Sequence, residues 1–237
     1  ASDVYKRQLQ GVLVPIRGSL EQFTTSSIGL LSTAYSIGFV FSCFLTPRLV
    51  RRVGHIRTFA VLSALAASII LLMGLIVHPL FWIPLRIVSG FCLAGLFMVI
   101  ESWLNEKSTN DNRGQVFSVY MMINLSAVTI GQMLLPVGNP ADHVLFVITG
   151  MAILLALIPV GLTTSAAPAP LAEVKLRLRR LYKMSPVGIL GCFFVGMANG
   201  AYGGLGAVFA QKLGFSLFEV ALFMSVSLIG GALAQIP

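Results

Sequence analysis

The stretch Thr46–Arg57, TPRLVRRVGHIR, carries four arginines and a histidine between two long apolar segments. The apolar residues run from Ile28 to Leu45 on one side and from Phe59 to Val77 on the other. Each run approaches the ~20 residues with which a helix crosses ~30 Å of hydrocarbon. Short loops rich in Lys and Arg are retained in the cytoplasm. The stretch therefore predicts two membrane-spanning helices joined by a basic cytoplasmic turn, and the orientation of the other segments follows by alternation.

The composition excludes an ordinary soluble domain. Of the 237 residues, 57% are hydrophobic and only 10% are charged, whereas soluble domains carry about 25% charged residues. The net charge of +8 does not indicate nucleic-acid binding, because the basic residues cluster in loops between apolar runs. The three cysteines lie inside apolar segments without the spacing of a metal site, so we expect no metal and no cofactor.

The predicted fold is an all-α polytopic membrane protein. A short apolar run at Leu9–Ile16 precedes seven expected helices, at Ser26–Leu45, Thr58–Val77, Leu80–Leu104, Gln115–Val137, Val144–Leu162, Val187–Ala210 and Leu217–Pro237. The loops that would then face the cytoplasm hold eleven Lys and Arg residues, and the outer loops hold two. This bias supports the predicted orientation, in which the loops after the second, fourth and sixth helices are cytoplasmic.

The chain divides into two unequal transmembrane parts. Residues 1–8, ASDVYKRQ, are polar and are expected to be foreign to a truncated first helix. Residues 9–162 form the N-terminal half, residues 163–186 a basic cytoplasmic linker, and residues 187–237 the start of a second half. Within the linker, Glu173–Tyr182 could form a basic amphipathic helix on anionic headgroups. A shift of 192 residues places Phe23 on Phe215 and Gly38 on Gly230, which predicts an internal repeat.

Three stretches carry a family resemblance: TPRLVRRVGHIR, LRIVSGFCLAG and VIESWLNEKSTNDNRGQVFSVYM. With them, the chain resembles the major facilitator superfamily, and within it the YcaD-like transporters, over about helices 1–8 of the family's twelve. The family's loop signature is Gly-x-x-x-Asp-Arg-x-Gly-Arg-Arg. This chain keeps Arg52 and Gly54 but has Pro47 at the first glycine and Arg51 at the aspartate. It lacks the Gly-Pro motif in helix 5, which argues against a drug/proton antiporter.

Arg86 is the leading candidate for a functional side chain. It lies within the fourth expected helix, where a charge is costly unless it faces a cavity or a partner. Arg86 and Gly90 are similar to the family's helix-4 motif. One interpretation is a site for a substrate anion or for proton coupling, and the alternative is a structural arginine that binds backbone carbonyls.

Glu101 is a candidate gate residue at the cytoplasmic end of the fourth helix. It could pair with Arg51, Arg52 or Arg57 and so hold the inner side of a transporter closed. The alternative is an ordinary carboxylate at the membrane surface.

Several neutral polar side chains could line a pathway. Asn124 and Gln132 lie eight residues apart on one side of the fifth helix, so they contact either substrate or neighbouring helices. The segment Gly196–Gly206 holds Asn199 and Tyr202, and its glycines permit either close packing or a break beside a cavity. Tyr35 is a weaker candidate of the same kind.

The function expected from these features is secondary active transport of a small solute by alternating access, with protons as a possible coupling ion. The partners would be that solute and the lipid bilayer. We also consider two alternatives, a membrane scaffold that transports nothing and an intramembrane enzyme whose catalytic residues lie outside these 237 residues. No signature of an enzyme is present in the sequence.

Overall fold

The structure, a computed structural model, is all-helical and describes residues 12–135, 139–162 and 182–233. Five helices in these ranges are long and apolar enough to cross a membrane: α2 (Thr25–Val53), α3 (His55–Leu75), α4 (Pro79–Lys107), α5 (Arg113–Met133) and α9 (Pro186–Lys212). The shorter helices are α6 (Val144–Leu155), α7 (Leu157–Gly161), α10 (Leu217–Leu233) and a first helix over residues 12–20. The predicted class, an all-α polytopic membrane protein, is confirmed.

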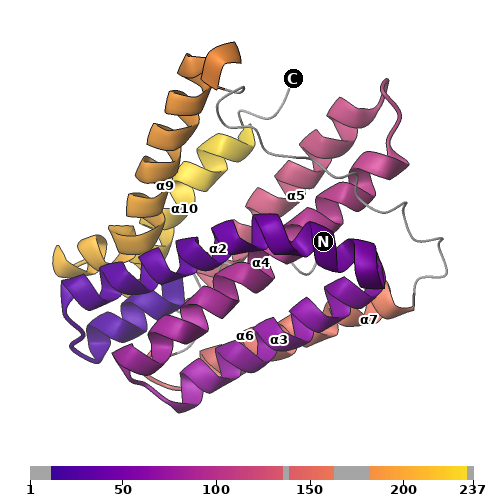
Figure 1. Cartoon of the computed structure of the whole chain (residues 1–237). Coiled ribbons are helices and arrows are strands. Elements are labelled where there is room, and N and C mark those ends of the chain that lie inside the picture. Colours follow the sequence, from indigo (N-terminus) through magenta and orange to yellow (C-terminus); the bar gives the residue numbers. More distant parts are fainter. Residues whose placement is uncertain (1–11, 136–138, 163–181, 234–237) are drawn as a thin grey trace.

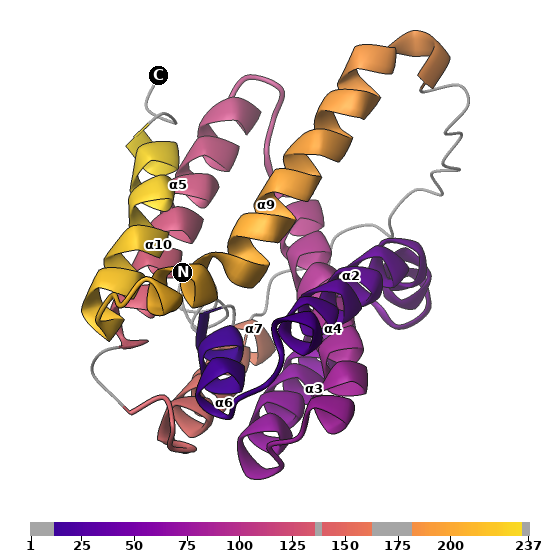
Figure 2. The same cartoon turned by 90° about the vertical axis from the view of Figure 1, so that its left-hand side faces the viewer.

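The helices form two groups that meet at one end. In the first group, α4 packs against α2 and α3, and α3 packs against α6. In the second group, α10 packs against α5 and α9. Figure 2 shows α9, α5 and α10 rising away from α2, α3 and α4. Contacts between α2 and α9 and between α4 and α5 join the groups.

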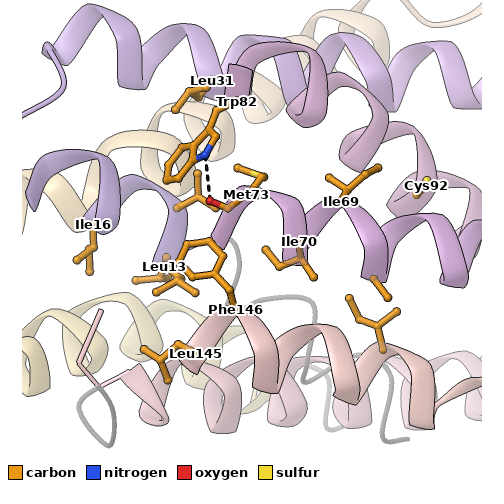
Figure 3. Close-up of a cluster of buried hydrophobic side chains, with 14 of the residues drawn as sticks. Leu13, Ile16, Leu31, Ile69, Ile70, Met73, Trp82, Cys92, Leu145 and Phe146 are labelled. Carbon is orange, nitrogen blue, oxygen red and sulfur yellow. Dashed lines mark hydrogen bonds between the residues drawn. The ribbon is translucent and has the colours of Figure 1, made fainter. Parts of the chain in front are cut away.

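The first helix lies in the core where the groups meet. Its residues 12–16 are all buried, and Leu13 and Ile16 lie beside the α6 residues Leu145 and Phe146 (Figure 3). Trp82 of α4 is fully buried in the same cluster. The polar stretch 1–8 lies outside the described residues.

The predicted loop Thr46–Arg57 is wrong, because almost all of it is helical. Helix α2 continues through Val53, and α3 begins at His55. The turn between them is Gly54 alone, with φ at +86°, a conformation that glycine adopts without steric cost. Arg51 and Arg52 lie in the last turn of α2, where cations interact favourably with the negative end of the helix dipole. The basic residues therefore extend the helix beyond the apolar run.

Prolines explain two further departures from the predicted boundaries. The expected helix at Val144–Leu162 is divided at Ala156 into α6 and α7. Pro159 accounts for this, because its ring clashes with the carbonyl four residues earlier, at the last residue of α6. Helix α5 ends at Met133, shortly before Leu135-Pro136, since a residue that precedes proline disfavours the helical conformation.

The glycine-rich segment Gly196–Gly206 is continuous helix within α9, so the alternative of a local break is wrong. Close packing is present only in its second part. A Cβ atom on Gly204 would lie 2.6 Å from Ser32 Oγ, and one on Gly206 would lie 3.2 Å from Met224 Sδ. A Cβ atom on Gly196, Gly200 or Gly203 would meet nothing within 4 Å.

The turn that enters α2 has the same hydrogen bonds as the turn that enters α10, 192 residues later. The donors are the amides of Glu21, Gln22, Phe23 and Ile28 in the first turn, and those of Leu213, Gly214, Phe215 and Val220 in the second, with acceptors also 192 residues apart. Positive φ angles recur at the same place, +58° at Gln22 and +89° at Gly214. The repeat predicted from sequence is therefore present in the backbone of these turns.

The expected linker contains residues 163–181, which lie outside the described residues together with nearly all of the expected amphipathic helix Glu173–Tyr182. The final residues 234–237 of the last expected helix also lie outside them.

Candidate functional site

The candidate site lies where α2 and α4 cross with their backbones in contact. A Cβ atom on Gly38 of α2 would overlap the carbonyl oxygen of Ile87, and one on Gly90 of α4 would overlap that of Tyr35. Small residues at such crossings let transmembrane helices approach closely and gain van der Waals contact. Gly90, singled out as part of a helix-4 motif, therefore acts through the packing of α4 on α2.

Arg86 lies one helical turn from Gly90 and is held by α2. Its side chain is 6% exposed. The guanidinium carbon lies 4.5 Å from the centre of the Tyr35 ring, and Nε donates a long hydrogen bond of 3.5 Å to the carbonyl oxygen of Leu31. A cation over an aromatic face is stabilised by roughly 2 kcal/mol or more when it is desolvated. Tyr35 and Arg86, predicted separately, thus form one unit.

The contacts of this unit match the structural interpretation of Arg86, and the functional interpretation stays a prediction. The bond to the Leu31 carbonyl is the structural role, and the ring of Tyr35 supplies a second stabilising contact. A guanidinium nevertheless presents five N–H donors in a planar fork, which suits a carboxylate or phosphate. The arrangement can therefore hold a positive charge inside the helix bundle in a fixed orientation.

A second polar contact continues the α2–α4 crossing. Ser42 and Thr46 share a hydrogen bond of 2.8 Å between their hydroxyl groups, and both are buried. A Cβ atom on Gly95 of α4 would lie 2.9 Å from the Thr46 hydroxyl oxygen. These residues fix the register of α4 along α2 beyond Gly90.

The gate residues predicted at the basic end do not meet in this structure. Within the described residues, Glu101 forms no ion pair with Arg51, Arg52 or Arg57. All four side chains are exposed. The arginines lie on the last turn of α2 and the first turn of α3 rather than in a loop. Tyr120 of α5 lies near the Glu101 carboxylate.

His55 makes the contact between α3 and α4 at this end. It is buried, and its Nε2 lies 3.0 Å from the hydroxyl oxygen of Ser102. Its ring also packs near that of Trp103, with centroids 6.4 Å apart. Sequence reasoning placed His55 in a loop. Nothing in the sequence around Ser102 indicated that its hydroxyl group contacts His55.

The polar residues of α5 and α9 have different surroundings. Gln132 is 4% exposed and accepts a hydrogen bond of 3.0 Å from the fully buried Ser225 of α10. Asn124 is half-buried, and Asn199 is exposed. The hydroxyl group of Tyr202 lies 3.0 Å from the carbonyl oxygen of Phe223, and this contact joins α9 to α10.

Trp82 is the main residue that sequence reasoning missed. Its indole N–H contacts two carbonyl oxygens at the end of α3, that of Met73 at 3.1 Å (Figure 3) and that of Ile76 at 2.8 Å. The ring of Phe23 packs edge-on against it, with centroids 5.5 Å apart. The available signal was a tryptophan in the first turn of a helix that begins with a proline, Pro79. Trp82 anchors the end of α4 nearest Arg86.

Among the described residues, no three His, Cys, Asp or Glu side chains gather as metal ligands. The described contacts of this site are hydrogen bonds, a cation over an aromatic ring and close backbone packing. These contacts orient the Arg86 guanidinium inside the helix bundle.

Comparison with known proteins agrees with the sequence and the fold. The family model of the Major Facilitator Superfamily matches residues 5–237. An "Uncharacterized MFS-type transporter YcaD" of Salmonella newport (strain SL254) is 28% identical over 232 residues, and that of Salmonella heidelberg (strain SL476) is 29% identical over 234 residues. Each alignment covers 95% of this chain, and the chain spans 59% of the length of these relatives. The chain belongs to the Major Facilitator Superfamily.

Proposed function

We propose that the protein, at the full length of its relatives, is a secondary active transporter that moves a small solute by alternating access. The observation that carries this proposal is the buried Arg86, held under Tyr35 between two membrane-length helices. Ionisable residues inside membrane bundles are rare, and by default they indicate a substrate or ion pathway. The repeated turns at Phe23 and Phe215 support two related halves that rock around a common site.

The orientation and the gate belong to the same proposal. The excess of Lys and Arg in the loops after α2, α4 and α6 supports a cytoplasmic position for these loops in the inner membrane. Glu101 is exposed beside the end that carries Arg51 and Arg57. In a second state of the protein, in which the inner side is closed, Glu101 would then pair with one of these arginines.

Transport is tested with the full-length protein in liposomes, using a panel of labelled carboxylates, amino acids, sugars and nucleosides. We expect at least one solute to accumulate, and Arg86→Ala to slow its uptake about tenfold or more, since hydrogen bonds to a charged group contribute roughly 1.5–3 kcal/mol. Arg113→Ala is the matched control, because Arg113 is exposed at the start of α5. A scaffold predicts no flux of any solute and no effect of Arg86.

Proton coupling, by symport or antiport, has its own test. Uptake of the identified solute should change with external pH and fall when a protonophore is added. Uptake that persists with the protonophore and ignores pH would overturn the coupling while leaving transport intact.

A further inference from the structure

Arg86 carries more hydrogen-bond donors into the helix bundle than its described neighbours accept. Its guanidinium has five N–H groups. Nε donates to the Leu31 carbonyl oxygen over 3.5 Å, which is longer than the usual range of about 2.7–3.2 Å. Within residues 12–135, 139–162 and 182–233, the four N–H groups of the terminal nitrogens donate to no acceptor. Most of the binding capacity of this 6%-exposed side chain is therefore unused.

The positive charge of Arg86 also lacks a carboxylate partner among the described residues. The sequence contains eight Asp and Glu residues, and two of them belong to segments outside the described residues. The other six lie in turns or near helix ends. Glu21 lies in the turn before α2 and already pairs with Arg17, at 2.7 Å between oxygen and nitrogen. Glu101 shares α4 with Arg86 but lies 15 residues away, which is about 22 Å along the helix.

The Tyr35 ring leaves the donors of Arg86 available. The guanidinium carbon lies over the ring, 4.5 Å from its centre. Because the N–H groups of a guanidinium point outward in its own plane, an aromatic ring covers one face and leaves the N–H edge for a planar acceptor. A charge inside a membrane bundle is costly unless it meets a partner or a water-filled path. The ring therefore orients the cation without neutralising it.

Arg86 holds a charge but does not exchange protons. A guanidinium stays protonated in proteins, so Arg86 cannot itself pass a proton across the membrane. A proton-coupling site at Arg86 therefore needs a second titratable group, whereas a substrate anion needs only the donors that are already present. The described contacts thus favour a solute that brings its own negative charge.

We propose that the transported solute carries a carboxylate, whose two oxygens bind the terminal nitrogens of Arg86 while Tyr35 covers the guanidinium face. This inference rests on the proposed function, because it names the class of solute that the same site would take. One carboxylate matches one guanidinium in charge and in the geometry of its two oxygens. A phosphate ester carries about −1.5 to −2 charges near neutral pH, which a single arginine does not balance.

Binding is tested with the full-length protein in detergent at neutral pH, where a bound ligand raises the unfolding temperature by mass action. The probes are acetate, lactate, benzoate and nicotinate, each beside its uncharged amide, together with inorganic phosphate. We expect at least one carboxylate to raise the unfolding temperature and to bind about tenfold or more tightly than its amide, since hydrogen bonds to charged groups are the stronger ones.

Variants of Arg86 separate its charge from its geometry. Arg86→Lys keeps the charge but loses the planar fork, so the carboxylate should bind about tenfold more weakly. Arg86→Met should abolish binding. Arg113→Lys and Arg113→Met are the matched controls, because Arg113 is exposed at the start of α5, and both should bind the carboxylate as the unchanged protein does.

The unfolding temperature without ligand gives a second readout. Arg86→Met removes a buried charge that has no described counter-ion, so the ligand-free variant should unfold at the same temperature as the unchanged protein or at a higher one. A large fall in this temperature would show that Arg86 serves the fold, and it would overturn the inference.

Three binding results would also overturn the carboxylate assignment: no carboxylate binds, an amide binds as tightly as its acid, or phosphate binds more tightly than every carboxylate. Failure of the proposed function has a different signature. A carboxylate that binds through Arg86 but does not enter liposomes containing the full-length protein contradicts transport and leaves the ligand class intact. Uptake of an uncharged solute that no carboxylate inhibits contradicts the ligand class and leaves transport intact.

Discussion

The turn before α2 and the turn before α10 have the same backbone but different neighbours. In both turns, backbone amides donate to carbonyl oxygens four or five residues earlier, at the end of the preceding helix. A hydroxyl group then caps the following helix, that of Thr24 for α2 and that of Ser216 for α10. Phe23, which ends the first turn, packs against the buried Trp82. Phe215 at the equivalent place is 41% exposed and packs against Phe223 of α10, the helix that follows the turn. Local sequence therefore determines the turn, whereas the neighbouring helix determines its packing.

The same contrast extends into the helices. Gly38 of α2 touches the backbone of α4, whereas a Cβ atom on its equivalent Gly230 would meet nothing within 4 Å among the described residues. The repeat predicts that Gly230 has the same role as Gly38 in a longer chain, with a partner 192 residues after α4. The two glycines are thus a matched pair in which one contact is present and the other is predicted.

The largest effect is expected from replacing these glycines with alanine. Gly38→Ala places a methyl group on the Ile87 carbonyl oxygen, and the helix backbones must separate to accept it. We expect a loss of about 3 kcal/mol of stability, at the upper end of overpacking costs. Gly230→Ala in this 237-residue chain should stabilise α10 by up to about 1 kcal/mol, the difference in helix propensity. Thermal unfolding in detergent measures both.

The outcome in the full-length protein sharpens the comparison. If Gly230→Ala becomes as damaging there as Gly38→Ala, the second half repeats the α2–α4 crossing. If Gly230→Ala stays harmless in the full-length protein, the repeat is limited to the turn.

A smaller effect is expected at the positive φ angles of the turns. Gly214→Ala forces a side chain into a left-handed conformation at φ +89° and should cost about 1–2 kcal/mol. Gln22→Gly removes the same kind of cost at φ +58° and should raise the unfolding temperature. Denaturation of the two variants in detergent, beside the unchanged chain, measures the opposite signs. A destabilising Gln22→Gly would show that the Gln22 side chain contributes more than its backbone conformation costs.

Much of the fold was predictable from the sequence, because apolar runs of membrane length set the number and order of the helices. The ends of the helices were less predictable, because a helix can continue beyond its apolar run. Thr46–Val53 illustrates this, because its arginines suggested a loop while a single glycine makes the turn. Pro159, in contrast, divides a run that hydropathy alone treats as one helix.

The candidate site was predictable in its residues but not in its pairings. Arg86 is conspicuous as a charge in an apolar run, and Gln132 as an amide. Tyr35 over Arg86 depends on the register of α2 against α4, which is determined by where Gly38 and Gly90 allow close approach. Nothing in the sequence singles out Ser225, 93 residues from Gln132. The gate at Glu101 was predicted from charge alone, and charge does not determine which state brings the groups together.

The smallest effect concerns the two helix caps. Thr24 accepts from the Ser27 amide at 3.1 Å, and Ser216 accepts from the Glu219 amide at 3.3 Å. Glu219 also accepts from the Ser216 amide at 2.7 Å, which completes a reciprocal capping box that α2 lacks. Thr24→Ala and Ser216→Ala should each cost about 1 kcal/mol. Hydrogen exchange of the first-turn amides in detergent reports each helix start separately. The reciprocal bond makes α10 the more protected start, and Glu219→Ala should reduce its protection to that of α2. Equal protection before this change would show that the second bond adds nothing, and that the two turns are equivalent in energy as well as in backbone.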